Sequence, residues 1–160
     1  MTINEKEVAF WEHYATTAES LCLFEGTEYC AVAYYEELGE LAGVFAKNLR
    51  GDGPVDDANV LKEIGDVLWN LAVSLKRDAP ARVSLLAAYQ DPYKMLYPEC
   101  ATYELVIRLF SLDDVTELLR ALNLIAKRHG GDLEKCAEMN LEKLMSRKER
   151  GQLRGSGDDR

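Results

Sequence analysis

Apolar residues recur every three or four positions along almost the whole chain, with polar residues between them. No segment shows the strict alternation of apolar and polar residues, bounded by tight turns, that predicts a β-hairpin. The pattern therefore predicts an all-α fold, an antiparallel helical bundle of about five to six helices.

Capping residues and helix breakers divide this pattern into separate helices. The predicted helices cover about residues 5–23, 27–50, 58–78, 98–110, 114–129 and 133–150. Gly51 and Pro80 end the second and third of these, and Pro98 is suited to begin the fourth. The segment 81–100 contains prolines and tyrosines without a clean period, so we expect a loop at its tip.

The chain is expected to form one helical domain over residues 1–150, followed by a glycine-rich, charged tail over residues 151–160. Its 160 residues, of which 48% are hydrophobic, suffice for a single core. Asp and Glu outnumber Lys and Arg by 28 to 19, and the net charge of −9 disfavours a nucleic-acid polymer as partner.

The four cysteines include no CxxC pair, which predicts free thiols and a reducing compartment. The N-terminal stretch is too charged for a signal peptide, and no apolar run approaches the roughly 18 residues of a membrane span. We therefore expect a cytoplasmic protein without membrane contact.

Two acidic pairs lie in otherwise apolar surroundings. Glu37 and Glu40 are three residues apart, as are Glu63 and Asp66, so the members of each pair share one helix face. The chain between the pairs is long enough to turn and return antiparallel, which would bring the four carboxylates together. Two such charges about 5 Å apart repel by roughly 3 kcal/mol at an effective dielectric constant of about 20. Oxygen ligands in this number favour Mg²⁺ or Mn²⁺ as the compensating cation.

A solvated helix face is the competing interpretation of the acidic pairs, and spacing alone leaves it open. Gly39 and Gly65 argue against it, because a glycine inside a helix costs roughly 1 kcal/mol relative to alanine and indicates close approach of a helix or ligand. A di-iron carboxylate site is disfavoured, since neither His13 nor His129 has a glutamate three residues before it.

Two separated motifs resemble those of the MazG-like, all-α nucleoside triphosphate pyrophosphohydrolases. The stretches "EELGE" and "KEIGDVLWNLA" resemble the EExxE and ExxD signature of this family. The C-terminal "NLEKLMSRKERGQLRGSGDDR" is similar to a branch in which Asn, Lys and Arg precede a GSGD tail. The resemblance covers about residues 27–78 and 121–160, whereas residues 81–120 form a longer segment than in compact members. It implies a homodimer or homotetramer that uses Mg²⁺, or Mn²⁺ in its place.

The resemblance also implies roles for individual residues. The implied metal ligands are Glu37, Glu40, Glu63 and Asp66, and Glu36 would orient or deprotonate the attacking water. The predicted substrate contacts are Lys47, Asn70, Asn140, Lys143 and Arg147. For Glu36, Lys47 and Arg147, an ordinary solvated helix surface is the competing interpretation.

Recognition of the base is left open by the sequence. Asn70 lies one turn after Asp66, where relatives often carry an aromatic ring. Trp11, His13 and Tyr14 could supply a stacking surface instead, although Trp11 and Trp69 are better candidates for the core.

These features predict Mg²⁺-dependent hydrolysis of NTPs or dNTPs, noncanonical ones included, to the monophosphate and pyrophosphate, a house-cleaning of the nucleotide pool. The alternatives are a phosphoribosyl-ATP pyrophosphatase-like activity and a noncatalytic helical interaction module. Broad apolar helix faces further predict at least a homodimer. The residues of these faces are Leu118, Leu119, Leu122 and Ile125 on one helix and Leu141, Leu144 and Met145 on another.

Overall fold

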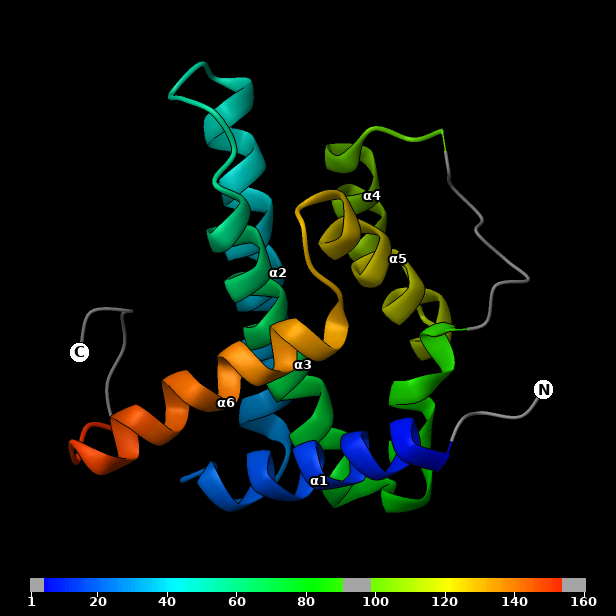
Figure 1. The fold of residues 1–160 in the computed structure, drawn as a ribbon, viewed down its shortest axis with the longest axis vertical. Coiled ribbons are helices and arrows are strands. Elements are labelled where there is room, and N and C mark those ends of the chain that lie inside the picture. Colours follow the sequence, from blue (N-terminus) through cyan, green and yellow to red (C-terminus); the bar gives the residue numbers. More distant parts are fainter. Residues whose placement is uncertain (1–4, 91–98, 154–160) are drawn as a thin grey trace.

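The computed structural model describes residues 5–90 and 99–153. Within these residues the chain forms six α-helices and one 3₁₀ helix and contains no strand, which confirms the predicted all-α fold (Figure 1). The elements are α1 Glu5–Leu21, α2 Glu28–Leu49, α3 Asp57–Asp78, η1 Pro80–Gln90, α4 Thr102–Leu109, α5 Val115–Arg128 and α6 Leu133–Glu149. Pro98 and most of the predicted tail, residues 154–160, lie outside the described residues.

Helices α2 and α3 form a hairpin and lie side by side (Figure 1). Helix α2 ends at Leu49, and Gly51 follows with a φ of +86°, a left-handed conformation that favours glycine. Asp56 then caps α3, since its carboxylate accepts hydrogen bonds from the backbone N–H groups of Ala58 and Asn59 at 3.0 and 3.3 Å. This turn returns the chain antiparallel, as predicted from the distance between the acidic pairs.

Helix α3 is central to the fold and packs against α1, α2, α5, α6 and η1. Eleven of its 22 residues are buried, among them Ile64, Val67 and Leu68. Full burial of such side chains stabilises the fold by about 1.5–3 kcal/mol each. The core therefore fixes the rotation of α3, and with it the direction of the polar residues on this helix.

Gly65 lets α6 cross α3 at short distance. A Cβ atom at this position would lie 2.7 Å from the carbonyl oxygen of Cys136 and 3.1 Å from Cβ of Asn140, both on α6. The close approach predicted for Gly65 is confirmed. At Gly39 no neighbouring helix comes close, because a Cβ atom there would meet nothing within 4 Å in the described part of the chain.

The segment after α3 forms η1, α4 and α5, which complete the core. Helix α4 begins at Thr102 rather than near Pro98, because the Glu104 carboxylate accepts a hydrogen bond from the backbone N–H of Ala101 at 3.0 Å and marks the first turn there. Asp114 caps α5 by accepting a hydrogen bond from the backbone N–H of Glu117 at 2.9 Å.

The leucine-rich face of α5 is covered within the chain. It packs against η1, α3, α4 and α6, so this face does not support the predicted homodimer. The residues concerned, at most 3% exposed, are Leu118, Leu119, Leu122 and Ile125. On α6, Leu141 and Leu144 are half-buried and Met145 is 51% exposed.

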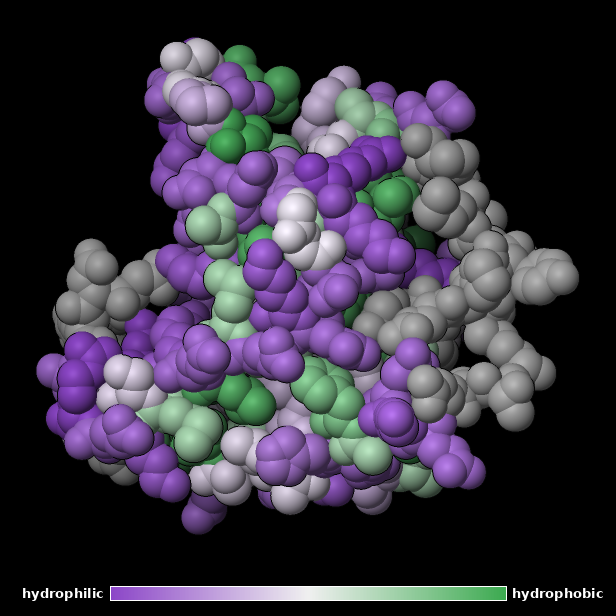
Figure 2. All heavy atoms as spheres, in the orientation of Figure 1, coloured by the Kyte–Doolittle hydropathy of each residue, from purple (hydrophilic) through white to green (hydrophobic). Residues whose placement is uncertain are grey.

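Hydrophilic residues cover most of the face seen in Figure 2, and the hydrophobic residues visible there form small separate groups. Among the helices that the structure describes, none combines the length and the apolar character that crossing a membrane requires.

Candidate metal centre and adjoining pocket

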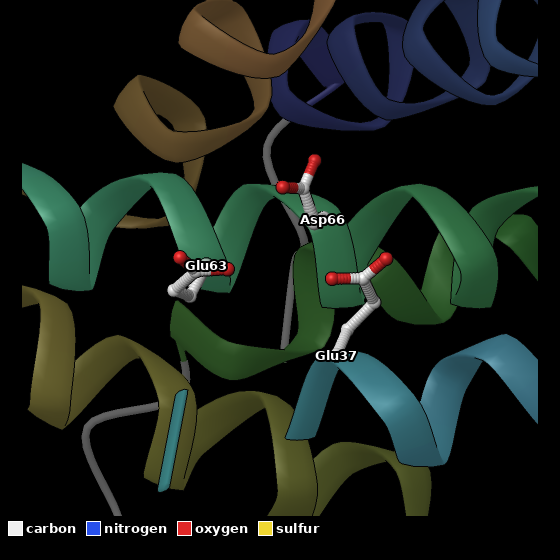
Figure 3. A group of neighbouring side chains, drawn as sticks. All are labelled: Glu37, Glu63 and Asp66. Carbon is white, nitrogen blue, oxygen red and sulfur yellow. The ribbon is translucent and has the colours of Figure 1, made fainter. Parts of the chain in front are cut away.

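Three carboxylates converge between α2 and α3: Glu37 from α2 and Glu63 and Asp66 from α3 (Figure 3). One oxygen atom of each lies within 4.8 Å of the others. Glu63 is only 4% exposed, whereas Glu37 and Asp66 are half-buried. The donor set consists entirely of hard oxygen atoms from two rigid helices, which fits the requirements of Mg²⁺ or Mn²⁺.

Burial and mutual repulsion oppose ionisation within this cluster. The pKa of Glu37 rises from its ordinary value of 4.5 to about 8, mainly through burial and further through the charges of Asp66, Glu40 and Glu63. Lys143 acts in the opposite direction and lowers this pKa. At pH 7 the Glu37 carboxyl is therefore protonated unless a cation compensates its charge, and cation binding would release that proton.

Two side chains from α6 bind Asp66. Nζ of Lys143 donates to Oδ1 and Oδ2 of Asp66 at 2.5 and 2.6 Å, and Nδ2 of Asn140 donates to Oδ1 at 2.6 Å. Nζ of Lys62 lies 3.7 Å from Oε1 of Glu63. Two ammonium groups thus accompany three carboxyl groups. When all three carboxyl groups are ionised, the cluster has a net negative charge that a cation can compensate.

A pocket of about 290 Å³ adjoins the three carboxylates. Its walls come from α1, the α1–α2 turn, α2, α3, α6 and the residues just after α6. Eight of the ten predicted site residues line it: Glu36, Glu37, Glu40, Asp66, Asn70, Asn140, Lys143 and Arg147. Residues assigned to the site from helical spacing on α2 and α3 and from the family resemblance on α6 thus line one pocket.

The other two predicted site residues lie outside the pocket lining. Glu63 belongs to the carboxylate cluster but is buried. Lys47 is exposed near the end of α2. It lies outside the pocket because it is about 10 Å further along the helix than Glu40. Glu40 itself is exposed on the pocket wall and is not part of the 4.8 Å cluster, so three of the four predicted ligands come together.

The apolar part of the pocket was missed by the sequence analysis. It is formed by Leu21, Leu23, Phe24, Tyr29, Trp69, Leu144 and Leu153. Trp69, predicted as core, is half-buried and belongs to this wall. A signal was available in "CLFEGT", since this run places Leu23 and Phe24 on the turn between two helices, where a core is not expected.

The other proposed stacking residues do not reach the pocket. Trp11 is buried in the core, as predicted, and Tyr14 is also buried at 1% exposure, whereas His13 is exposed elsewhere on α1. Asn70 is 2% exposed, and its Nδ2 donates to the backbone carbonyl of Asp66 at 3.2 Å. Its side chain is therefore anchored on its own helix at the pocket wall.

Comparison of the chain with protein-family models, with curated proteins and with solved structures finds no match.

Proposed function

We propose that this protein is a Mg²⁺-dependent nucleoside triphosphate pyrophosphohydrolase of the MazG-like type, acting on free NTPs or dNTPs in the cytoplasm. The observation that carries the proposal is the cluster of Glu37, Glu63 and Asp66, with oxygen atoms within 4.8 Å, beside a pocket that also holds Lys143 and Arg147. Carboxylates for a divalent cation and basic groups for phosphates are the two requirements for binding a triphosphate with its metal.

The three clustered carboxylates would hold the cation, with Glu40 close enough to influence their charge. When bound, Mg²⁺ or Mn²⁺ supplies charge neutralisation for the phosphates and raises the acidity of water. The negative charge of the cluster repels a bare triphosphate, so binding of the nucleotide without a cation is disfavoured.

The chain's own residues have three tasks in this proposal. Lys143 neutralises Asp66 in the free protein and would turn towards the phosphates when the cation takes over that charge. Arg147, one turn further along α6, adds a second basic group at the pocket. Glu36 is exposed on the pocket wall and is suited to orient the attacking water and accept its proton.

We also infer a homodimer or homotetramer, on different residues from those that the sequence suggested. One apolar stripe runs along α4 and onto the residue that follows it: Tyr103, Ile107 and Phe110 are 39%, 67% and 46% exposed. An apolar stripe of this kind fits the same stripe on a second copy of the chain.

The test is a panel of canonical and modified NTPs and dNTPs, together with phosphoribosyl-ATP, in the presence of Mg²⁺. We expect pyrophosphate rather than orthophosphate as the first product, and loss of most activity in Glu37→Gln. Glu138→Gln, an exposed position on α6 outside the pocket, is the matched control and should keep full activity. Orthophosphate as the first product would contradict the proposal, and selective cleavage of phosphoribosyl-ATP would replace the substrate. Inactivity on every compound would favour the interaction module.

A further inference from the structure

Two aromatic rings are stacked on each other at the pocket, partly in contact with solvent. The ring centroids of Phe24 and Tyr29 lie 3.9 Å apart with an interplanar angle of 22°. The two residues are 44% and 43% exposed, and both line the pocket. A flat apolar ligand that stacks on this pair would bury area that the chain leaves in water.

The turn between α1 and α2 that carries Phe24 is fixed by several contacts. Nη1 of Arg77, on α3, donates to the backbone carbonyls of Phe24 and Gly26 at 2.7 and 2.5 Å. Gly26 has a φ of +71°, a conformation that other residues rarely adopt. At the start of α2, the side chain of Thr27 makes no capping bond, and its backbone N–H donates to the Glu28 carboxylate at 3.1 Å. The ring pair is thus held in place before any ligand binds, which lowers the entropic cost of binding.

The aromatic and the charged parts of the pocket are continuous. Tyr29 and Glu36 are seven residues apart on α2, so both lie on the same helix face, two turns from each other. Trp69 extends the aromatic wall from α3, whose Asp66 belongs to the carboxylate cluster. The pocket therefore suits a ligand with a flat ring at one end and cation-bound phosphates at the other.

We propose that the Phe24–Tyr29 pair is the stacking surface for the nucleobase, with Trp69 in the adjoining wall. This inference rests on the proposed function, because it assigns the base of the proposed substrate to the apolar part of the same pocket. It explains how a chain with Asn70 on α3 still provides an aromatic surface: the surface comes from the α1–α2 turn.

Equilibrium binding separates the base from the phosphates. The probes are α,β-imido analogues of the nucleoside triphosphates, which cannot release pyrophosphate, and inorganic tripolyphosphate, each titrated calorimetrically with Mg²⁺ present. Phe24→Leu and Tyr29→Leu keep an apolar side chain but remove the flat ring. We expect each to weaken binding of the nucleotide analogues about tenfold or more, in line with the loss of one stacking contact, while binding of tripolyphosphate changes less than twofold.

Two controls accompany these variants. Tyr29→Phe retains the ring and should bind like the parent. Tyr35→Leu, also on α2 and 61% exposed but outside the pocket, should leave both affinities unchanged. In the unmodified protein, nucleotide analogues should quench tryptophan fluorescence, tripolyphosphate should not, and Trp69→Phe should remove the effect.

The outcomes distinguish the two proposals. Pyrophosphate release by the parent, with unchanged nucleotide affinity in both leucine variants, would overturn the base subsite and leave the proposed function standing. Equal weakening for nucleotide and tripolyphosphate, no quenching in the parent, or no nucleotide binding at all would also overturn it. If both leucine variants bind the nucleotide analogues more weakly and tripolyphosphate normally, but the parent releases no pyrophosphate, the subsite is supported and the enzymatic function is refuted.

Discussion

The protonation of Glu37 links the carboxylate cluster to the stability of the fold. Its pKa is about 8 in the native state and 4.5 as a free side chain, so between these values the native protein holds a proton that the unfolded chain releases. Stability from this group is complete below pH 4.5 and is lost as the pH rises to 8.

We therefore expect the free energy of unfolding, measured by urea denaturation with a metal chelator, to fall from pH 5 to pH 8. Glu37→Gln cannot ionise, so the variant should show a clearly smaller fall over the same range. Identical pH dependence in parent and variant would mean that burial and the neighbouring charges do not raise the pKa of Glu37.

Replacement of Lys143 should change cation binding and pyrophosphate release in opposite directions. Its ammonium occupies both oxygens of Asp66, so it competes with a divalent cation for that ligand. Lys143→Met should tighten binding of Mn²⁺ in the absence of nucleotide, because the cluster gains negative charge. The same change should reduce pyrophosphate release by at least tenfold, since a phosphate contact is lost.

Calorimetric Mn²⁺ titration and a pyrophosphate assay check the two effects separately. Lys148→Met, an exposed change on the same helix, is the control and should alter neither quantity. Weaker Mn²⁺ binding in Lys143→Met would show that Lys143 supports the cation site instead of competing for it.

The crossing of α3 and α6 depends on a single glycine. In Gly65→Ala the new methyl group would lie 2.7 Å from the backbone carbonyl oxygen of Cys136, so a helix has to move. Overpacking of this kind costs about 1–3 kcal/mol of unfolding free energy. The movement should also separate Lys143 from Asp66 and reduce pyrophosphate release.

Gly39→Ala is the matched control on α2. A Cβ atom at Gly39 meets nothing within 4 Å in the described part of the chain, so the change should stabilise the helix by about 0.5–1 kcal/mol. Urea denaturation of both variants gives the comparison, and equal effects at Gly65 and Gly39 would contradict the close crossing.

Local signals predicted the helices well where caps and breakers mark their ends. Gly51 marks a helix end through its positive φ. Asp56 and Asp114 mark helix starts through side-chain hydrogen bonds to backbone N–H groups of the first turn. The start of α4 and the extent of η1 were not predictable in this way. A periodic apolar stripe also indicates only that a helix face is covered and not what covers it, so the α5 face suggested a dimer although it is covered within the chain.

The candidate site was predictable to the extent that helical spacing defines it. Spacing places Glu37, Glu63 and Asp66 on facing helix surfaces, but the tilt and rotation of the helices decide which oxygen atoms meet. Glu40 therefore remained on the pocket wall. The aromatic wall was missed because Phe24 lies on a turn, where no periodicity indicates the direction of a side chain.

We expect copies of the chain to assemble with one another through the exposed apolar stripe of α4. Light scattering should return a multiple of 18.0 kDa for the parent protein at micromolar concentration. Ile107→Asp places a charge in the exposed stripe and should shift the mass towards the monomer, whereas Ala9→Asp, exposed on α1, should not. A parent mass of 18.0 kDa would contradict the assembly and leave the chemistry of the pocket untouched.

The most direct test of the proposed hydrolysis is the fate of the oxygen atom that enters the product. The parent protein is incubated with a cleavable nucleoside triphosphate and Mg²⁺ in ¹⁸O-labelled water, and the products are analysed by mass spectrometry. Attack at the α-phosphorus predicts one ¹⁸O atom in the nucleoside monophosphate and none in the pyrophosphate. Glu63→Gln, which removes one charge from the carboxylate cluster, should yield little of either product. Label in pyrophosphate or orthophosphate, or equal yields from parent and variant, would contradict cleavage at the α-phosphorus by the carboxylate cluster.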